Sequence, residues 1–403
     1  MAELNKQIEV FLIHQRLEEE EDLKKILLAK EYEKRHQTSR LLKLSESLNN
    51  KLEFKKNKSL DDYYHGCIIN DLLYYNPEVS AQWRGDTPLL NKADTYLDGF
   101  YLLGKWRYRS EFLERQRLLK EEDQPFFDLD ILQRIGENFS IPVVNLYQKK
   151  QEAGKSFTEG QFVKLKKTYF DSFENMSFKD QQIFYFYLLN SLMGIIQMGK
   201  TKLFETLFDL YWFGIKKRLL LYHGRLSANT YANIITLGNR IKKFEEIDSF
   251  IKTYTIHLRE EEQTDGATWG RAHWHFNKKE YENAIEYLRI YKFKNNSFEI
   301  LGRFLLLQVY FELLRKDTSY SFLFFDYTKS LKKNIQRNKY LSQSRKKAFQ
   351  NYIKYISKIA HVLDKKDKTK YQELIHQINN EEIIQGKRWM LETLDQIISE
   401  IKK

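Results

Sequence analysis

The stretch WGRAHWHFNKKEYENAIEYL, from Trp269 to Leu288, decides the fold. Its bulky residues recur at helical spacing on both sides of a short polar turn, which is the pattern of two joined amphipathic helices. Neither helix can bury its apolar face alone, so the pair requires further helices stacked against it. The stretch therefore predicts one unit of an all-α array that acts through contact on an exposed surface.

A second copy of the pattern lies upstream. The segment KKFEEIDSFIKTY, from Lys242, aligns with KKEYENAIEYLRIY, from Lys278, with one inserted residue. The aligned positions are 37 residues apart, close to the period of about 34 of tetratricopeptide (TPR) repeats. The small side chain of Ala284, between Tyr281 and Leu288 on one face, lets two helices approach. We therefore predict an all-α, TPR-like α-solenoid of stacked antiparallel helix pairs. The aligned pairs are Phe244/Tyr281, Ile247/Ala284, Ile251/Leu288 and Tyr254/Tyr291.

Proline marks the helical part of the chain. All four prolines lie in the first 142 residues, and a proline costs about 3 kcal/mol inside a helix. The absence of proline after residue 142 therefore favours an uninterrupted series of helices. No segment alternates polar and apolar residues as a half-buried strand does, so we expect no sheet. Ser227 is a good N-cap, and Gly224 is expected where the preceding helix ends. The other expected helices span 11–35, 97–120, 244–258, 269–276, 280–291, 298–314 and 319–331.

The chain of 403 residues exceeds one compact core. We expect a less regular N-terminal helical region over 1–124 and a TPR-like helical array over 125–403, with a soft boundary within one continuous solenoid. Loops or breaks are expected at 77–88, 121–127 and 151–160.

Several segments together carry a resemblance to a known family. With these segments the chain resembles a family of uncharacterised bacterial TPR-like proteins. The resemblance implies an all-helical array over most of the chain, and it implies no catalytic motif or agreed activity. The segments are LDGFYLLGKWRY from Leu97, IFYFYLLNSL from Ile183, GKTKLFETLFDLYWFGIKKRLLLYHGRLSANTYANIITL from Gly199, LLLQVYFELL from Leu305, FDYTKSLKKN from Phe325 and QGKRWMLETLDQI from Gln385.

Cysteine and hydropathy patterns predict the compartment. The single cysteine, Cys67, permits no disulfide within the chain and favours a reducing, cytoplasmic setting. The apolar run from Val10 to Ile13 is short and is followed by acidic residues, whereas a signal peptide has a longer apolar run. We therefore do not interpret it as a signal peptide. The uncharged window 181–199 contains several amide side chains, so we expect a buried helix and no membrane insertion.

The motif GIIQMGKT satisfies the phosphate-binding loop pattern G-x-x-x-x-G-K-[ST]. Such a loop must follow a strand and open a helix, whereas both flanks here are predicted to be helical. Bulky residues also fill the part that would wrap around a phosphate. We interpret Gly194, Gly199, Lys200 and Thr201 as a chance match, and nucleotide binding at 194–201 stays the least favoured alternative.

No other pattern predicts catalysis or a bound metal. His273 and His275 are two positions apart on a helix, so their rings point in different directions. His65 and Cys67 have no placed third partner, and no carboxylate pair has a recognisable catalytic setting. We expect no catalytic residue, metal or cofactor.

The function predicted from these patterns is a non-catalytic protein–protein interaction scaffold or adaptor. Its partner would be a peptide or helix held on a concave face. The pattern specifies neither the partner's identity nor an oligomeric state. Candidate contact residues, some of which must instead be core, are Trp269, Arg271, His273, Trp274 and Asn277.

The net charge of +12 supports an alternative function. The window 329–370 holds 14 Lys and Arg against two acidic residues. In the helix expected after Ser342, apolar residues share one face and several lysines lie on another. This stretch is either a solvated face or the basic face of a nucleic-acid-associated protein. The candidate residues are Lys346, Lys347, Lys354 and Lys358.

Overall fold

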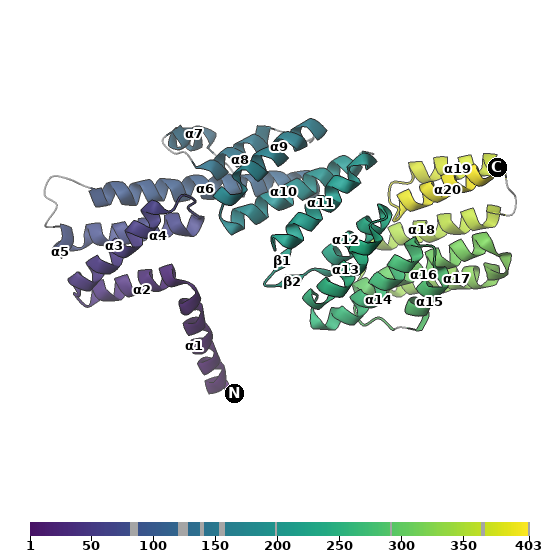
Figure 1. Cartoon of the computed structure of the whole chain (residues 1–403), viewed down its shortest axis with the longest axis horizontal. Coiled ribbons are helices and arrows are strands. Elements are labelled where there is room, and N and C mark those ends of the chain that lie inside the picture. Colours follow the sequence, from purple (N-terminus) through teal and green to yellow (C-terminus); the bar gives the residue numbers. More distant parts are fainter. Residues whose placement is uncertain are drawn as a thin grey trace. The chain divides into compact units, whose positions relative to one another are not determined.

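The computed structural model describes residues 1–401 apart from 81–87, 120–127, 138–140, 153–157, 198–199, 291 and 364–366. The described chain is all-α, as predicted, with 20 α-helices and one two-stranded hairpin. It forms two compact units, Met1–Leu203 and Phe204–Lys403 (Figure 1). The sequence placed a soft boundary near residue 124 instead. Helices from both sides of that point pack together, so the first unit continues to Leu203.

The first unit stacks its helices in chain order. Helix α2 contacts α3 and α4, and α4 packs along α6. Helix α6 contacts α8, and α9 contacts both α8 and α10. The helices are α1 (Ala2–Glu19), α2 (Glu21–Lys34), α3 (Thr38–Phe54), α4 (Leu60–Tyr75), α5 (Pro77–Ser80), α6 (Pro88–Leu119), α7 (Leu129–Glu137), α8 (Pro142–Glu152), α9 (Glu159–Ser172) and α10 (Phe178–Gln197).

Two expectations for this unit need correction. The single helix predicted over 11–35 is broken at Glu20, whose φ of −110° and ψ of 77° are not helical, so α1 and α2 are separate. The loop predicted over 77–88 begins with the short helix α5. The expected break at 121–127 and residues 153–157 of the loop predicted over 151–160 lie outside the described residues, whereas 151–152 end α8 and 159–160 begin α9.

Helices α4 and α6 approach closely because each presents a glycine to a tyrosine of the other. A Cβ atom added to Gly66 would meet the Tyr96 ring at 2.5 Å, and one added to Gly99 would meet the Tyr63 ring. The two tyrosine rings are both buried and lie edge to face, 6.3 Å apart. Close helix contact thus depends on the same Tyr-x-x-Gly spacing in both helices.

A buried carboxylate joins three later helices of the first unit. Asp180, in the first turn of α10, is 1% exposed. It accepts hydrogen bonds from Arg107 of α6 at 2.9 Å, Tyr147 of α8 at 3.2 Å and Ser177 at 2.6 Å. Because a buried charge is tolerated only when it is paired and hydrogen-bonded, this network fixes α10 against α6 and α8.

The second unit repeats one contact pattern. Each helix from α12 to α20 packs on the next, and α12, α14, α16, α18 and α20 also contact one another in series (Figure 1). The elements are α11 (Phe204–Lys216), β1 (Leu221–Tyr222), β2 (Arg225–Leu226), α12 (Ala228–Arg240), α13 (Phe244–Tyr254), α14 (Glu260–Asn277), α15 (Tyr281–Ile290), α16 (Asn296–Lys316), α17 (Ser321–Arg337), α18 (Gln343–Val362), α19 (Lys368–Asn380) and α20 (Lys387–Ile401).

The turns of the internal repeat have the same backbone geometry. Lys242 and Lys279, 37 residues apart, have left-handed φ values of 62° and 65°. After α12, the Lys243 N–H donates to the Gly238 carbonyl at 2.8 Å. After α14, the Glu280 N–H donates to the His275 carbonyl at 3.0 Å. Both helix ends therefore form the Schellman motif with lysine where glycine is usual.

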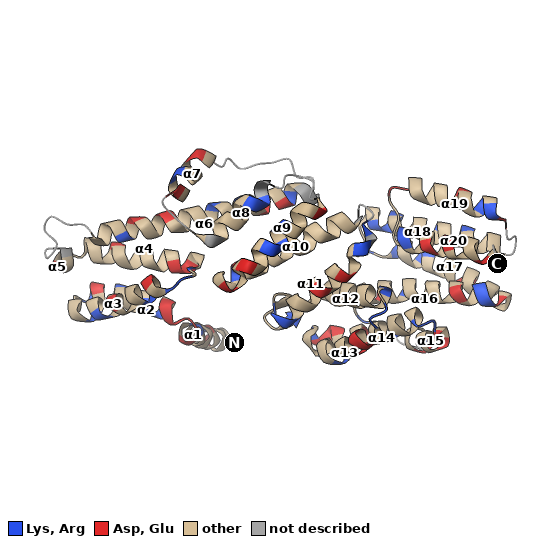
Figure 2. Ribbon diagram, turned by 45° about the horizontal axis from the view of Figure 1, so that its top comes forward, with Lys and Arg blue, Asp and Glu red and all other residues tan. Residues whose placement is uncertain are grey.

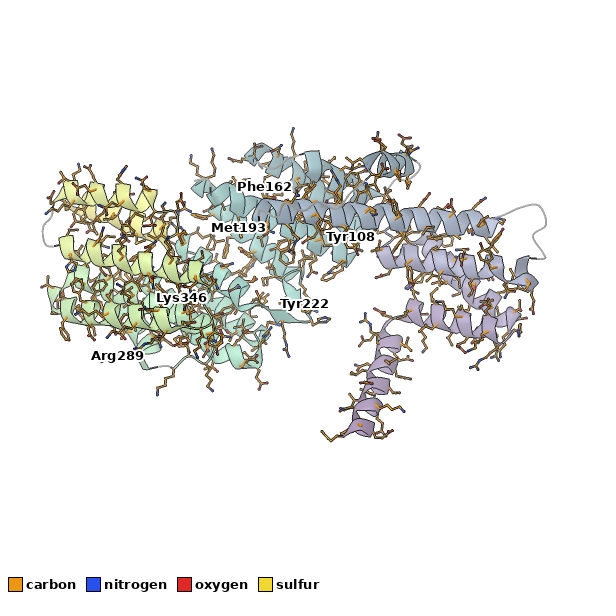
Figure 3. The ribbon with its side chains drawn as sticks, turned by 180° about the vertical axis from the view of Figure 1, so that it is seen from behind. Tyr108, Phe162, Met193, Tyr222, Arg289 and Lys346 are labelled. Atoms are coloured by element: carbon orange, nitrogen blue, oxygen red, sulfur yellow. The ribbon has the colours of Figure 1, made fainter. Side chains whose placement is uncertain are left out.

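A small hairpin precedes the repeats, so the expectation of no sheet was wrong at this point. Strands β1 and β2 pair antiparallel around His223 and Gly224, whose φ values are both positive, 49° and 77°. This is the backbone of a tight two-residue turn, so Gly224 does not end a helix as predicted. Tyr222, labelled in Figure 3, is 74% exposed beside the turn. Ser227 is the predicted N-cap and accepts from the Thr230 N–H at 3.1 Å.

We predict that Gly99→Ala destabilises the first unit. The added methyl group collides with the buried Tyr63 ring, and overpacking of this kind costs about 1–3 kcal/mol. Gly104→Ala, on the same helix, is the matched control, because its nearest atom would be 3.6 Å away and alanine favours helix over glycine. Urea unfolding of both variants measures the difference. Equal stability of the two variants would contradict the proposed close contact.

Candidate functional site

The five residues predicted to hold a partner all lie on α14, but their side chains are used within the fold. Trp269 is 3% exposed, and its ring lies 5.1 Å from the His273 ring and 6.1 Å from the Phe298 ring, centroid to centroid. It is therefore one of the candidate residues that lie in the core, as was expected for some of them. Helical spacing alone could not separate the buried side of α14 from the exposed side.

Arg271 and Trp274 fasten α14 to α13. The half-buried guanidinium of Arg271 forms an ion pair with Asp248. The Trp274 indole N–H donates to the Phe244 carbonyl at 2.8 Å, and Lys278 lies 4.2 Å above the Trp274 ring. A charge-reversing change at Arg271 would bring two carboxylates together, so it would disturb packing as well as any binding.

His273 links α14 to α12, and Asn277 of α14 supports its ring. The His273 Nδ1 atom lies 2.9 Å from the Asn239 Nδ2 atom and 3.2 Å from the Asn277 Nδ2 atom. Two amide donors leave this ring nitrogen as an acceptor, which requires a neutral imidazole. Burial lowers the pKa of His273 to about 4. The ring is therefore uncharged at neutral pH and acts in packing.

The neighbouring His275 has different partners. Its Nδ1 atom lies 2.6 Å from a carboxylate oxygen of Glu280, and its ring stacks on Tyr287 with 5.6 Å between centroids. The two histidines thus point to different neighbours, as their spacing predicted. No group of three potential metal-ligating side chains lies together in the part of the chain that the structure describes.

The structure places the first half of the phosphate-loop motif in a helix. Gly194 to Gln197 form the last turn of α10, so a helix, and not a strand, leads into the motif. Lys200 is exposed, and Thr201 begins a short 3-10 helix. Gly199 lies outside the described residues. The described part therefore lacks the strand-to-loop geometry that cradles phosphates.

The four predicted basic residues lie on α18. Lys347 and Lys354 are exposed, whereas Lys346 donates to the Gln336 carbonyl of α17 at 3.1 Å. Lys358 donates to the Gln377 amide oxygen of α19 at 2.8 Å. By helical spacing, Lys347, Lys354 and Lys358 share one face of α18, and Lys346 lies about 100° away from Lys347.

Sequence reasoning missed an exposed apolar helix at the start of the first unit. Helix α1 has no buried residue, and six of its large apolar side chains are 47–65% exposed. These exposed residues are Leu4, Ile8, Val10, Phe11, Leu12 and Ile13. The signal was present in the apolar run 10–13, which was read only as evidence against a signal peptide.

A surface pocket between α6 and α10 also went unpredicted. It has a volume of about 390 Å³, and its lining includes Glu111, Glu114 and Tyr187. Beside it, the buried Lys150 of α8 lies 3.4 Å from the Glu114 carboxylate and 3.1 Å from the centre of the Tyr187 ring. Burial raises the pKa of the Tyr187 hydroxyl. The Glu114 carboxylate at this pocket is therefore paired with a buried cation.

The chain matches no protein-family model, no curated protein and no solved structure. The resemblance to TPR-like proteins therefore rests on the segments quoted from the sequence, and the all-α class rests on the structure. Among the described residues, no helix combines the length and the apolar character required to cross a membrane.

We predict that acid destabilises the protein through His273. As pH falls below about 6.5 the unfolded chain binds a proton at this ring, whereas the folded chain does so only near a pKa of about 4. Stability is therefore lost as pH falls from about 6.5 to 4, by up to about 3 kcal/mol for this group. Urea unfolding from pH 7 to 4 measures the loss, which His273→Gln should reduce.

The matched control is His223→Gln at the exposed hairpin, which should leave the pH profile unchanged. If His273→Gln and the wild-type chain lost stability in parallel over this range, the neutral, partly buried His273 would be ruled out as the cause.

Proposed function

We propose that this protein is a TPR-like helical scaffold that acts by binding another protein through contact and not through catalysis. Two features of the second unit support the TPR-like architecture. Alternate helices contact one another in series, and equivalent turns recur 37 residues apart with the same hydrogen bonds. Each pair of helices then buries its apolar face against its neighbours, as stacked repeats do.

The observation that carries a protein-binding function is helix α1. Leu4, Ile8 and Phe11 follow one another at helical spacing and share one face, while Val10 and Ile13 lie towards another. Within the described residues, α1 contacts its neighbour α2 and makes no comparable contact with another helix. Several large apolar side chains exposed together on one helix are typical of a surface that contacts another protein.

The chemistry of α1 specifies the kind of partner. A helix with apolar residues on two sides suits a groove between helices of another protein, where both sides are buried. Burying one such side chain stabilises a complex by about 1.5–3 kcal/mol. Several of them suffice for specific binding after the entropy cost of association. We therefore propose that α1 contacts the partner, and not the residues of α14 that the sequence pattern suggested.

We predict that Ile8→Asp/Phe11→Asp removes the partner without unfolding the chain. Neither residue is buried, so the fold loses no core contact, while charges on the apolar face oppose burial. The measurement is crosslinking and affinity capture from the native host, followed by reconstitution with the purified partner. Gln7→Asp/His14→Asp, which adds the same charge between the two apolar faces, should retain the partner.

Two results would argue against this function. One is capture of the same defined protein by both α1 variants, which would remove α1 from the contact. The other is self-association of the purified chain that only Ile8→Asp/Phe11→Asp abolishes, measured by light scattering. In that case α1 would join copies of this chain and would not recruit another protein.

A further inference from the structure

The excess positive charge belongs entirely to the second unit. Residues 1–203 hold 31 Lys and Arg and 31 Asp and Glu, whereas residues 204–403 hold 36 and 24. Within the second unit, the excess is concentrated in α17, α18 and their connection. From 327 to 363 there are ten Lys and Arg and no acidic residue. Figure 2 marks these Lys and Arg positions in blue along α17 and α18.

These cations differ from others in the same unit because they lack carboxylate partners. Arg240 pairs with Glu392, Arg271 with Asp248, and Arg315 with Glu312. By contrast, in the described part of the chain no Lys or Arg from 329 to 358 forms an ion pair. Lys346 donates to a backbone carbonyl and Lys358 to an amide oxygen, and neither acceptor carries a negative charge.

The packing of α17 on α18 brings lysines of the two helices to one edge. The His361 ring of α18 stacks on the Phe325 ring of α17, with 4.5 Å between centroids. Seven residues from this contact, two helical turns or about 10 Å along each antiparallel helix, lie Lys332 on α17 and Lys354 on α18. These two lysines therefore occupy the same edge.

Two further lysines extend this edge towards the connection between the helices. Lys347 is seven residues before Lys354 on the same face of α18, and Lys339 lies in the connection just after α17. All four side chains are exposed. Lys346, labelled in Figure 3, ties the start of α18 to the end of α17. We call Lys332, Lys339, Lys347 and Lys354 the lysine edge.

This arrangement opposes the stability of the isolated protein. Like charges at close spacing on helices repel one another. The first turn of α18 also carries Arg345, Lys346 and Lys347 and no acidic residue, although the N-terminal end of a helix favours negative charge. A bound polyanion would relieve this repulsion.

We propose that the lysine edge binds the sugar-phosphate backbone of a nucleic acid. Its cations follow one another at intervals of about 10 Å along two helices, so several can neutralise phosphates of one strand together. The only large hydrophobic residue exposed among described residues 329–358 is Tyr340, at 78%, and its ring can stack on a base. An acidic peptide would need apolar anchors that this surface does not present. Binding is independent of base sequence, since the contacts are to charge.

The test measures binding of the full chain to labelled single-stranded RNA and duplex DNA of about 30 nucleotides by fluorescence anisotropy at about 50 and 200 mM salt. The variant is Lys332→Gln/Lys347→Gln/Lys354→Gln. The matched control removes the same charge elsewhere in the second unit, at exposed positions, as Lys216→Gln/Lys292→Gln/Lys294→Gln. Circular dichroism checks that each chain is folded.

We expect the wild-type affinity to fall at least about tenfold between the two salt concentrations, because neutralised phosphates release counterions. The lysine-edge variant should bind at least about tenfold more weakly at low salt and show a salt slope lower by about two units. The control should stay within about twofold. Comparing RNA with DNA shows which source of phosphates the edge prefers.

Three results would overturn the proposal. These are no binding of either nucleic acid by the wild-type chain at low salt, equal losses in the variant and the control, and displacement of nucleic acid by polyglutamate at equal charge concentration. The last result would assign the edge to an acidic protein. The α1 variant Ile8→Asp/Phe11→Asp should keep nucleic-acid binding, so failure of the scaffold function and failure of this proposal are distinguishable.

Discussion

Both units depend on close approach of helices at glycine positions, where no side chain separates the two backbones. In the first unit, Gly66 and Gly99 each admit a tyrosine ring of the opposite helix. In the second unit, a Cβ atom on Gly238 would meet Ile247 of the next helix, and Gly270 lies against Ile235 and Ile251. Since helix pairs in a stacked array touch only their neighbours, each close contact sets the position of the next pair. An added methyl group would therefore shift more than one helix.

Buried and exposed charges are stabilised in different ways in this structure. Buried charges are few and are held by networks, such as Asp180 with its three hydrogen-bond donors, because an unpaired buried charge is unstable. Exposed charges in much of the chain form local ion pairs, which contribute little but keep the surface neutral. The α17–α18 surface differs, because its exposed Lys and Arg residues from 329 to 358 form no such ion pairs in the described part of the chain. An apolar α1 in the neutral unit and the lysine edge in the cationic unit give the chain two chemically different surfaces.

The α14 residues show why a candidate site was harder to predict than the fold. Trp269, Arg271 and His273 combine aromatic and polar groups, a composition typical of binding surfaces and also of the seams between repeat units. Their partners, Asn239 on α12 and Asp248 on α13, come from other helices. Only when the helices are packed does a polar side chain on one element find its partner on another. The exposed face of α1 escaped notice for the opposite reason, since a sequence does not say which apolar residues lack a neighbour.

The sequence by itself determined the all-α class, most helices of the second unit, the N-cap at Ser227 and the 37-residue offset of the repeat. These properties depend on the local spacing of apolar residues, on the absence of proline after residue 142 and on helix capping, which act within one or two helical turns. The tertiary structure decided the break at Glu20, the hairpin at His223 and Gly224, and the division after Leu203. It also decided which side chains are buried and which cations lack partners. Those outcomes depend on contacts between residues far apart in the chain, and such contacts leave no periodic signal in the sequence.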